Sequence, residues 1–103
     1  MTEKEIHDIC KKYYIRNYKI NPDGSIDVNG NVDLSYMGLT KIPLKFNKVN
    51  GWFDCSYNKL TSLEGCPKEV EWSFYCYGCK RNFTGKEVKA LCKVKGNIGL
   101  KKY

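Results

Sequence analysis

The sequence predicts an α+β protein: a short β-solenoid with a helix and a hairpin at its N-terminal end and a helix and a strand at its C-terminal end. Segments that begin at Asn31, Trp52 and Ser73 align with one another at a constant shift along the chain. Such a repeat is typical of solenoids, in which stacked copies bury what one copy cannot. The segments TEKEIHDIC and TGKEVKALC, which flank the repeats, share a helix-start pattern.

The 103 residues are expected to form a single domain, 1–103. Within it, 1–30 form the N-terminal helix and hairpin cap, 31–84 about three 21-residue repeats, and 84–103 the C-terminal helix and strand cap. No apolar run approaches the roughly 20 residues of a membrane span. The charged start lacks the apolar core of a secretory signal, so a cytoplasmic protein without a membrane partner is expected.

The first helix is predicted from a capping box. Thr2 is followed three residues later by Glu5, so the hydroxyl and the carboxylate satisfy free amides at a helix start. Spacings of 0, 3, 4 and 7 give this helix one apolar face: Ile6, Ile9, Cys10 and Tyr13.

The next segment, YKINPDGSIDVNGNVDL, has the pattern of strand, turn and strand. Pro22-Asp23-Gly24 and Asn29-Gly30 are strong turn signals. Apolar residues alternate with polar ones on either side of the second turn: Ile26, Val28, Val32 and Leu34.

Each repeat is expected to supply one short strand and then return along the other side of the coil. The aligned inward columns hold Val32, Phe53 and Phe74, then Leu34, Cys55 and Cys76, then Met37, Asn58 and Cys79. Further on, Val49 matches Val70, and Arg81 stands where Leu39 and Leu60 stood. The third copy therefore departs from the pattern in its second half.

This spacing resembles the leucine-rich repeat, whose consensus has Asn or Cys at its ninth position. FDCSYNKL, Phe53 to Leu60, matches it fully, VDLSYMGL matches except at Met37, and FYCYGCKR matches except at Arg81. The resemblance covers roughly 26–84. It implies that the polar residue of this column points inward and bonds backbone groups of the neighbouring turn, which Asn does well and Cys more weakly.

A narrower resemblance rests on INPDGSIDVNGNVDLS, LTSLEGCPKEV and FTGKEVKALCKVKG. Together they are similar to short leucine-rich-repeat proteins encoded by large tailed bacteriophages. That resemblance implies a viral accessory protein made in the host cytoplasm. It supplies no activity for individual residues.

The C-terminal helix repeats the capping box, with Thr84 as N-cap and Glu87 three residues later. Val88, Leu91 and Cys92 form its expected apolar face. After it, GNIGL offers Ile98 and Leu100 as a last strand.

Four of the six cysteines, Cys66, Cys76, Cys79 and Cys92, match the ligand count of a structural zinc site. Zinc ribbons normally join two Cys-x-x-Cys knuckles, and this chain has one. Because Cys76 shares a column with Leu34, the cysteines are interpreted as core residues, with zinc and redox chemistry as alternatives. No cofactor or metal is expected.

Catalysis is not expected. The single histidine, His7, lies three residues before Cys10, but a surface histidine on a helix explains it better than a nucleophile and base. No phosphate-binding glycine loop and no recognisable carboxylate pair is present, so neither an enzyme nor a small-molecule ligand is predicted.

The outward positions of the predicted strands form the candidate binding face. Residues that alternate with the buried columns bring four side chains into one patch: Trp52, Asp54, Tyr75 and Tyr77. Exposed Trp and Tyr beside an acidic group are typical of protein interfaces. The alternative is that the hairpin or the terminal segment folds over these rings and makes them secondary core.

The formal charge of +7 is unevenly distributed. Residues 1–79 carry ten Lys and Arg against ten Asp and Glu, whereas 80–103 carry eight against one. The candidate basic patch comprises Lys80, Arg81, Lys86, Lys89, Lys93 and Lys95. Such an excess attracts nucleic acid or an acidic protein, although a solvated helix face explains it equally well.

The function expected from the sequence is a non-enzymatic protein-binding module, a phage accessory protein that engages a host protein and inhibits it. A defence factor is one such target. The alternative is a nucleic-acid-associated protein that binds through the basic C-terminal quarter. Against it, Asp27, Asp33 and Asp54 lie on the predicted sheet faces and repel phosphate.

Overall fold

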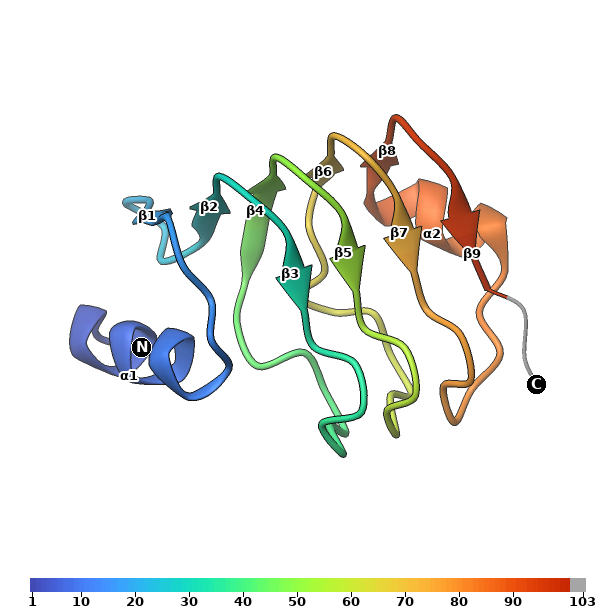
Figure 1. Ribbon diagram of the computed structural model, residues 1–103, viewed down its shortest axis with the longest axis horizontal. Helices are drawn as coiled ribbons and strands as arrows, with labels where there is room; N and C mark the ends of the chain where they lie inside the picture. Colours follow the sequence, from blue (N-terminus) through green and yellow to red (C-terminus); the bar gives the residue numbers. More distant parts are fainter. Residues whose placement is uncertain (101–103) are drawn as a thin grey trace.

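The computed structural model describes residues 1–100; the last three residues of the expected C-terminal cap lie outside the described part. Two helices and nine strands follow one another in it (Figure 1). They are α1 (Glu3–Lys12), β1 (Tyr18–Ile20), β2 (Ile26–Val28), β3 (Val32–Asp33), β4 (Phe46–Val49), β5 (Phe53–Asp54), β6 (Glu69–Val70), β7 (Phe74–Tyr75), α2 (Gly85–Leu91), β8 (Lys93–Val94) and β9 (Ile98–Gly99).

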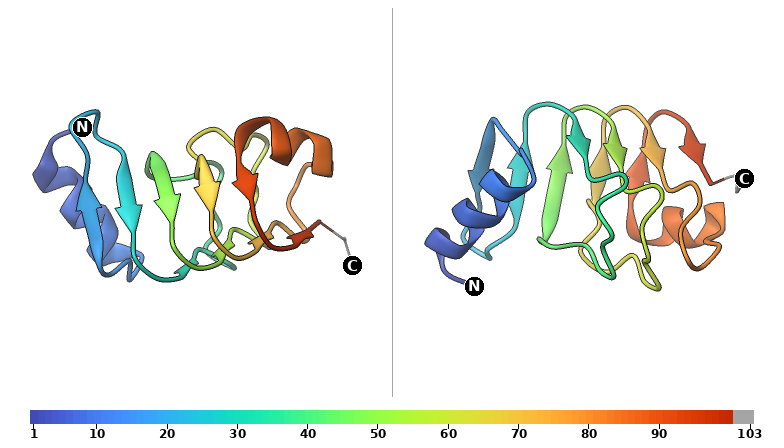
Figure 2. Two further views of the ribbon diagram at one scale, coloured as in Figure 1. Left: turned by 90° about the horizontal axis from the view of Figure 1, so that it is seen from above. Right: turned by 60° about the horizontal axis from the view of Figure 1, so that its bottom comes forward.

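The strands form two sheets that wind into a solenoid of about four turns. One sheet has the order β1-β2-β4-β6-β8 and the other β3-β5-β7-β9. Among the strands of residues 1–100, only the β1–β2 pair is antiparallel, and every other pair is parallel because each turn adds one strand to each sheet. Figures 1 and 2 show the turns stacked along the long axis. The predicted α+β fold with a β-solenoid is confirmed at this level.

The strand register follows the repeat seen in the sequence. Val32 pairs with Phe53, and Phe53 with Phe74, at the spacing that the sequence repeat predicts. Phe74 then pairs with Ile98 at a longer spacing, because the last turn contains α2. The sheets therefore extend beyond 31–84 at both ends.

A second strand in each turn was not predicted from the sequence. β4, β6 and β8 stack beside β2, and their register joins Val49 to Val70 and Val70 to Val94. The only sequence signal was the match of Val49 with Val70. These strands are two to four residues long, and one shared apolar column does not give the alternating pattern that identifies a strand.

The core runs along the solenoid axis between the two sheets. Phe46, Phe53 and Phe74 are fully buried, and neighbouring rings in this row have centroids 5.2 and 5.5 Å apart. Such offset aromatic pairs add roughly 1 kcal/mol to the burial of their area. The core is therefore continuous from one turn to the next.

Polar side chains of one column bond the backbone between turns. Asn58 is buried; its amide nitrogen donates to the carbonyl oxygen of Leu34 at 2.7 Å, and its oxygen accepts from the backbone N–H groups of Met37 and Leu39 at 3.0 Å. One turn later, the Cys79 thiol donates to the carbonyl oxygen of Cys55 at 3.4 Å. Cysteine thus reproduces one of the bonds that asparagine makes.

The two helices begin as predicted. Thr2 and Thr84 are the N-caps, and each forms a capping box with the glutamate three residues later. The two helices lie toward opposite ends of the solenoid (Figure 1). Within residues 1–100, neither helix has the length and apolar character needed to cross a membrane.

The apolar face of α2 differs from the prediction at one position. Val88 and Cys92 are buried, but Leu91 is 53% exposed. Spacing alone placed all three side chains on one face, whereas α2 is a seven-residue helix that contacts the solenoid along a narrower stripe. The apolar side chain of Leu91 therefore lies at the surface of the protein.

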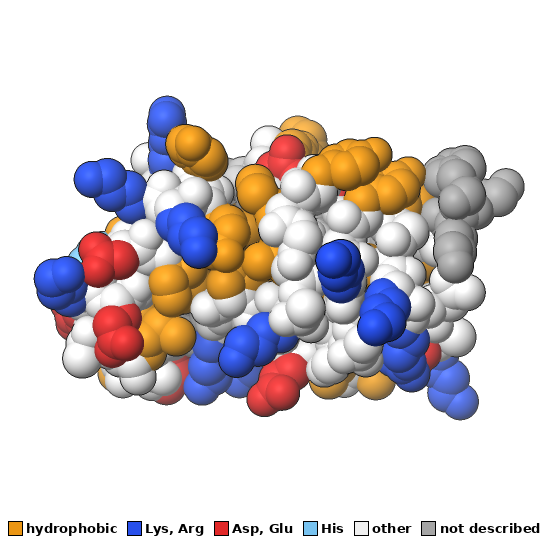
Figure 3. Space-filling view, turned by 90° about the horizontal axis from the view of Figure 1, so that it is seen from below, with side chains coloured by type: hydrophobic (Ala, Val, Ile, Leu, Met, Phe, Trp, Pro, Cys, Tyr) orange, Lys and Arg blue, Asp and Glu red, His pale blue; other side chains and the backbone are white. Residues whose placement is uncertain are grey.

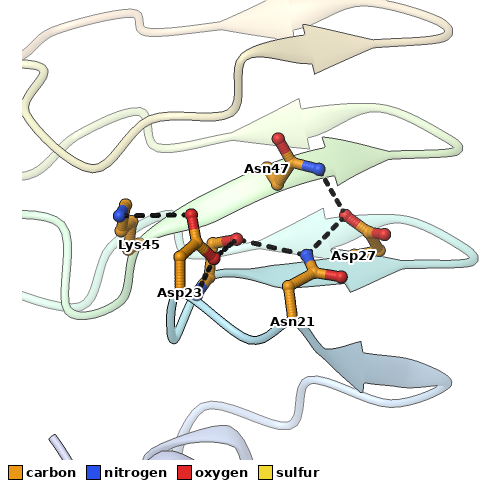
Figure 4. A network of polar contacts seen from close by, with 6 residues as sticks. Asn21, Asp23, Asp27, Lys45 and Asn47 are labelled. Carbon is orange, nitrogen blue, oxygen red and sulfur yellow. Dashed lines mark hydrogen bonds and ion pairs between the residues drawn. The ribbon is translucent and has the colours of Figure 1, made fainter.

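A polar network fastens the β1–β2 hairpin to β4 (Figure 4). Asp27 accepts hydrogen bonds from the amides of Asn21 at 3.1 Å and Asn47 at 2.8 Å. In the hairpin turn, Asp23 accepts from the backbone N–H and the hydroxyl of Ser25 and pairs with Lys45 at 3.4 Å. The network therefore joins the hairpin to the next turn of the solenoid.

Candidate protein-binding face

Asp54 and Tyr75 lie on the outward side of β5 and β7, while Trp52 comes just before β5 and Tyr77 just after β7. Phe53 and Phe74 point into the core, so their neighbours point outward. The parallel register places Asp54 beside Tyr75. The rings of Tyr75 and Tyr77 are stacked with centroids 5.9 Å apart. We refer to Trp52, Asp54, Tyr75 and Tyr77 as the aromatic face.

All four side chains of the aromatic face are partly buried. The hairpin does not cover them, because β1 belongs to the other sheet. The strand β9 lies beside the two tyrosines only, and a Cβ added at Gly99 would stand 2.3 Å from the Tyr77 hydroxyl oxygen. The rings of Tyr75 and Tyr77 therefore pack over Gly99, and part of each tyrosine remains exposed to solvent.

Two backbone groups of Tyr77 are hydrogen-bonded to the preceding turn of the solenoid. Its N–H donates to the Ser56 hydroxyl at 2.9 Å, and its carbonyl oxygen accepts from the N–H of Tyr57 at 2.7 Å. The Ser56 N–H in turn donates to the Asp54 carboxylate at 2.9 Å. These bonds fix the strand ends from which the aromatic side chains project.

A second pair of tyrosines was missed by the sequence interpretation. Tyr36 and Tyr57 are stacked with centroids 4.6 Å apart, and Tyr36 is 73% exposed. Both have a positive φ of 56°, and so does Gly78, which occupies the same column one turn later. A left-handed backbone is uncommon for tyrosine. The sequence signal for this conformation was the alignment of both tyrosines with a glycine, Gly78, which adopts it readily. Figure 3 shows hydrophobic side chains gathered along the upper right edge of this view.

The residues of the candidate basic patch are spread over three elements of the last turn. Two of them are ion-paired: Arg81 with Glu87, and Lys95 with both Glu69 at 3.7 Å and Glu71 at 3.0 Å. The other four form no ion pair within residues 1–100: Lys80, Lys86, Lys89 and Lys93. The loop after β7, α2 and β8 carry these lysines, so they follow the end of the solenoid and do not form a single row.

The four cysteines of the zinc alternative are all buried, and all six cysteines are free thiols. Among these four, only Cys76 and Cys79 are shown in contact, with sulfur atoms 2.9 Å apart. Residues 1–100 contain no group of three or more His, Cys, Asp or Glu side chains placed to hold a metal ion.

The environment of the cysteines keeps their thiols protonated. Burial raises the pKa of Cys66 to about 11 and that of Cys92 to about 12. The hydrogen bond with Cys55 raises the pKa of Cys76 far above its ordinary value, and the hydrogen bond with Cys76 does the same for Cys79. Since the thiolate is the nucleophile, these four protonated thiols are poor nucleophiles at neutral pH in this arrangement.

The histidine and cysteine of α1 both interact with the hydroxyl of Tyr18. His7 is exposed, and its Nδ1 is hydrogen-bonded to the Tyr18 hydroxyl. Cys10 is completely buried, and burial raises the pKa of its thiol.

Comparison of the chain with protein-family models, curated proteins and solved structures finds no match.

Proposed function

We propose that this chain is a non-enzymatic protein-binding module that contacts its partner through the aromatic face. The observation that carries the proposal is the stacked pair Tyr75 and Tyr77 beside Asp54 on a parallel sheet, with the partly exposed Trp52 just before the strand of Asp54. Tyr and Trp contribute large contact areas at low conformational cost, and such residues dominate the energy of many interfaces.

We also propose that the solenoid is leucine-rich-repeat-like and that its two ends are closed by caps. The hydrogen bonds of Asn58 support a leucine-rich-repeat-like coil, because they satisfy backbone groups of the preceding turn. In this interpretation α1 with the hairpin, and α2 with β9, close the two ends. The sequence resemblance supports a phage accessory protein that inhibits a host protein in the host cytoplasm.

A second candidate function is nucleic-acid binding through the basic patch. It is favoured by the four lysines that have no ion pair within residues 1–100. Phosphate contacts by such lysines give binding that weakens steeply as the salt concentration rises.

Affinity capture from a host lysate with paired variants tests the proposal. Trp52→Ala combined with Tyr75→Ala is expected to weaken capture of the partner at least about tenfold, because both rings leave the interface. Lys86→Glu combined with Lys89→Glu is expected to leave capture nearly unchanged. Unfolding curves of both double variants serve as the control for folding.

The opposite pattern favours the second candidate function. If the lysine variant abolishes capture and the aromatic variant retains it, the aromatic face is not the interface. Tight binding of generic DNA or RNA that weakens steeply with salt then identifies phosphate contacts as the main interaction.

A further inference from the structure

A groove lies on a surface that includes none of the four residues of the aromatic face. Its volume is about 610 Å³, and its floor is formed by the loop between β3 and β4 and the loop between β5 and β6. Met1 and Leu91, which are 72% and 53% exposed, are apolar lining residues from outside these loops. Figure 2 shows the two loops between α1 and α2 along the long axis.

The groove exists because the two central turns are shorter than the last one. The last turn is longer and places α2 between β7 and β8, whereas the turns before it have no helix at the equivalent place. Two adjacent turns occupy about 10 Å along the solenoid axis. An α-helix with its side chains is about 10 Å wide, so one helix covers both turns.

The chain already packs a helix against this side of the solenoid. Val88 of α2 is completely buried, and Cys66 of the groove lies close enough to Cys92 at the end of α2 to help burial raise the pKa of the Cys92 thiol. A second helix placed over the two loops would lie next to α2 and cover Leu91.

The charged side chains that line the groove indicate which kind of helix it can bind. The groove is lined by three lysines and one acidic residue: Lys41, Lys45, Lys68 and Glu64. Lys41 and Lys68 form no ion pair within residues 1–100, and Lys45 is only half exposed in its pair with Asp23. An apolar floor with a positive rim complements an amphipathic helix whose polar face is negative.

We propose that this groove binds an amphipathic α-helix of a partner protein whose polar face is acidic. The apolar side of the helix contacts the loop residues and Leu91, and its carboxylates face Lys41 and Lys68. This is the helix-in-groove mode of recognition, in which anchors at i, i+3, i+4 and i+7 enter the groove. The site is separate from the aromatic face and does not depend on the proposed function.

A display selection tests the proposal without a known partner. The library consists of helical peptides of about 16 residues, with apolar residues at i, i+3, i+4 and i+7 and a free choice of Glu, Lys, Ala or Gln elsewhere. Selection on the intact protein is expected to enrich Glu over Lys at the free positions. Backbone amide shifts measured by NMR with a selected peptide are expected to change for the two loops and Leu91.

Two variants and one control complete the experiment. Leu91→Glu, and separately Lys41→Glu with Lys68→Glu, are each expected to weaken the selected peptides about tenfold. Lys12→Glu with Lys19→Glu changes the net charge equally outside the groove and is expected to have little effect, as is Trp52→Ala. The proposal is overturned if no peptide is selected, if Lys is enriched as much as Glu, if the Leu91 variant binds normally, or if peptide binding requires Trp52.

Discussion

At the scale of single residues, the side chain of Asn58 satisfies several backbone groups of two turns at once. It is buried, and its amide also donates to the carbonyl oxygens of Cys55 and Ser56 at 3.1 and 3.2 Å, in addition to its bonds with the preceding turn. A buried backbone group without a partner costs roughly 1–3 kcal/mol, so one side chain here prevents several such costs. The adjacent columns are apolar, which makes water a poor substitute.

Replacing Asn58 by alanine is therefore expected to lower the free energy of unfolding by about 2–3 kcal/mol. The backbone N–H groups of Met37 and Leu39 lose their acceptor, and the carbonyl of Leu34 loses its donor. Denaturant unfolding of the two proteins measures the difference. Asn58→Cys is the matched control and should recover a small part of the loss, since Cys79 makes one such bond; an unchanged midpoint for Asn58→Ala would contradict this role.

At the scale of elements, the spacing between turns is set where the chain passes from one sheet to the other. Gly51 lies in the turn between β4 and β5, and a Cβ built there would be 2.4 Å from the Asn31 side-chain oxygen and 2.6 Å from the carbonyl oxygen of Gly30. Contacts this short with backbone atoms cannot be relieved by turning a side chain. A side chain at Gly51 therefore requires this turn to shift away from the preceding one, although the equivalent position of the next turn accepts Trp72.

Two glycine substitutions with opposite expected effects test this reasoning. Gly51→Ala should destabilise the protein by about 2 kcal/mol or more, because the turns must move apart. Gly85→Ala, at the first position of α2 with nothing within 4 Å of the added Cβ, should stabilise it by about 0.5 kcal/mol. Thermal unfolding compares the two; an equal loss in both variants would show that the turn contacts do not matter.

The elements that the sequence predicted best are those with a local signature. The capping boxes at Thr2 and Thr84 and the constant spacing of the repeats each depend on a few positions. The strands β4, β6 and β8 were missed because they share only one apolar column, Val49, Val70 and Val94, whereas the predicted strands share several. The outward direction of Trp52 and Tyr75 followed from strand alternation, whereas the stack of Tyr36 on Tyr57 depends on a backbone angle that residue type does not predict.

At the scale of the whole molecule, the polar network of the hairpin couples folding to pH. The hydrogen bonds from Ser25 lower the pKa of Asp23 from its ordinary value of 3.8 to about 2, with a smaller contribution from Lys45. Burial opposes ionisation of Asp27, but the bonds from Asn47 and Asn21 outweigh it and lower the pKa of that group too. Both carboxylates are therefore bound more favourably when ionised in the folded protein than in the unfolded chain.

The contribution of these two carboxylates to stability is accordingly expected to be fully present above about pH 4 and to be lost as the pH decreases from 4 toward 2. In this range the unfolded chain takes up protons that folded Asp23 and Asp27 resist. Chemical denaturation at a series of pH values measures the slope. Asp23→Asn is expected to reduce it, and an identical slope in that variant would exclude the contribution of Asp23.

The uniform register of the two sheets also determines how the chain assembles. Successive parallel strands of a sheet are separated by similar lengths of sequence, so every new turn closes a loop of nearly the same size. Loop-closure entropy depends only weakly on length, which makes the cost of each turn nearly equal. Folding can then advance one turn at a time from whichever turn forms first, and the turn that contains α2, with a neighbour on one side only, is the one expected to open first.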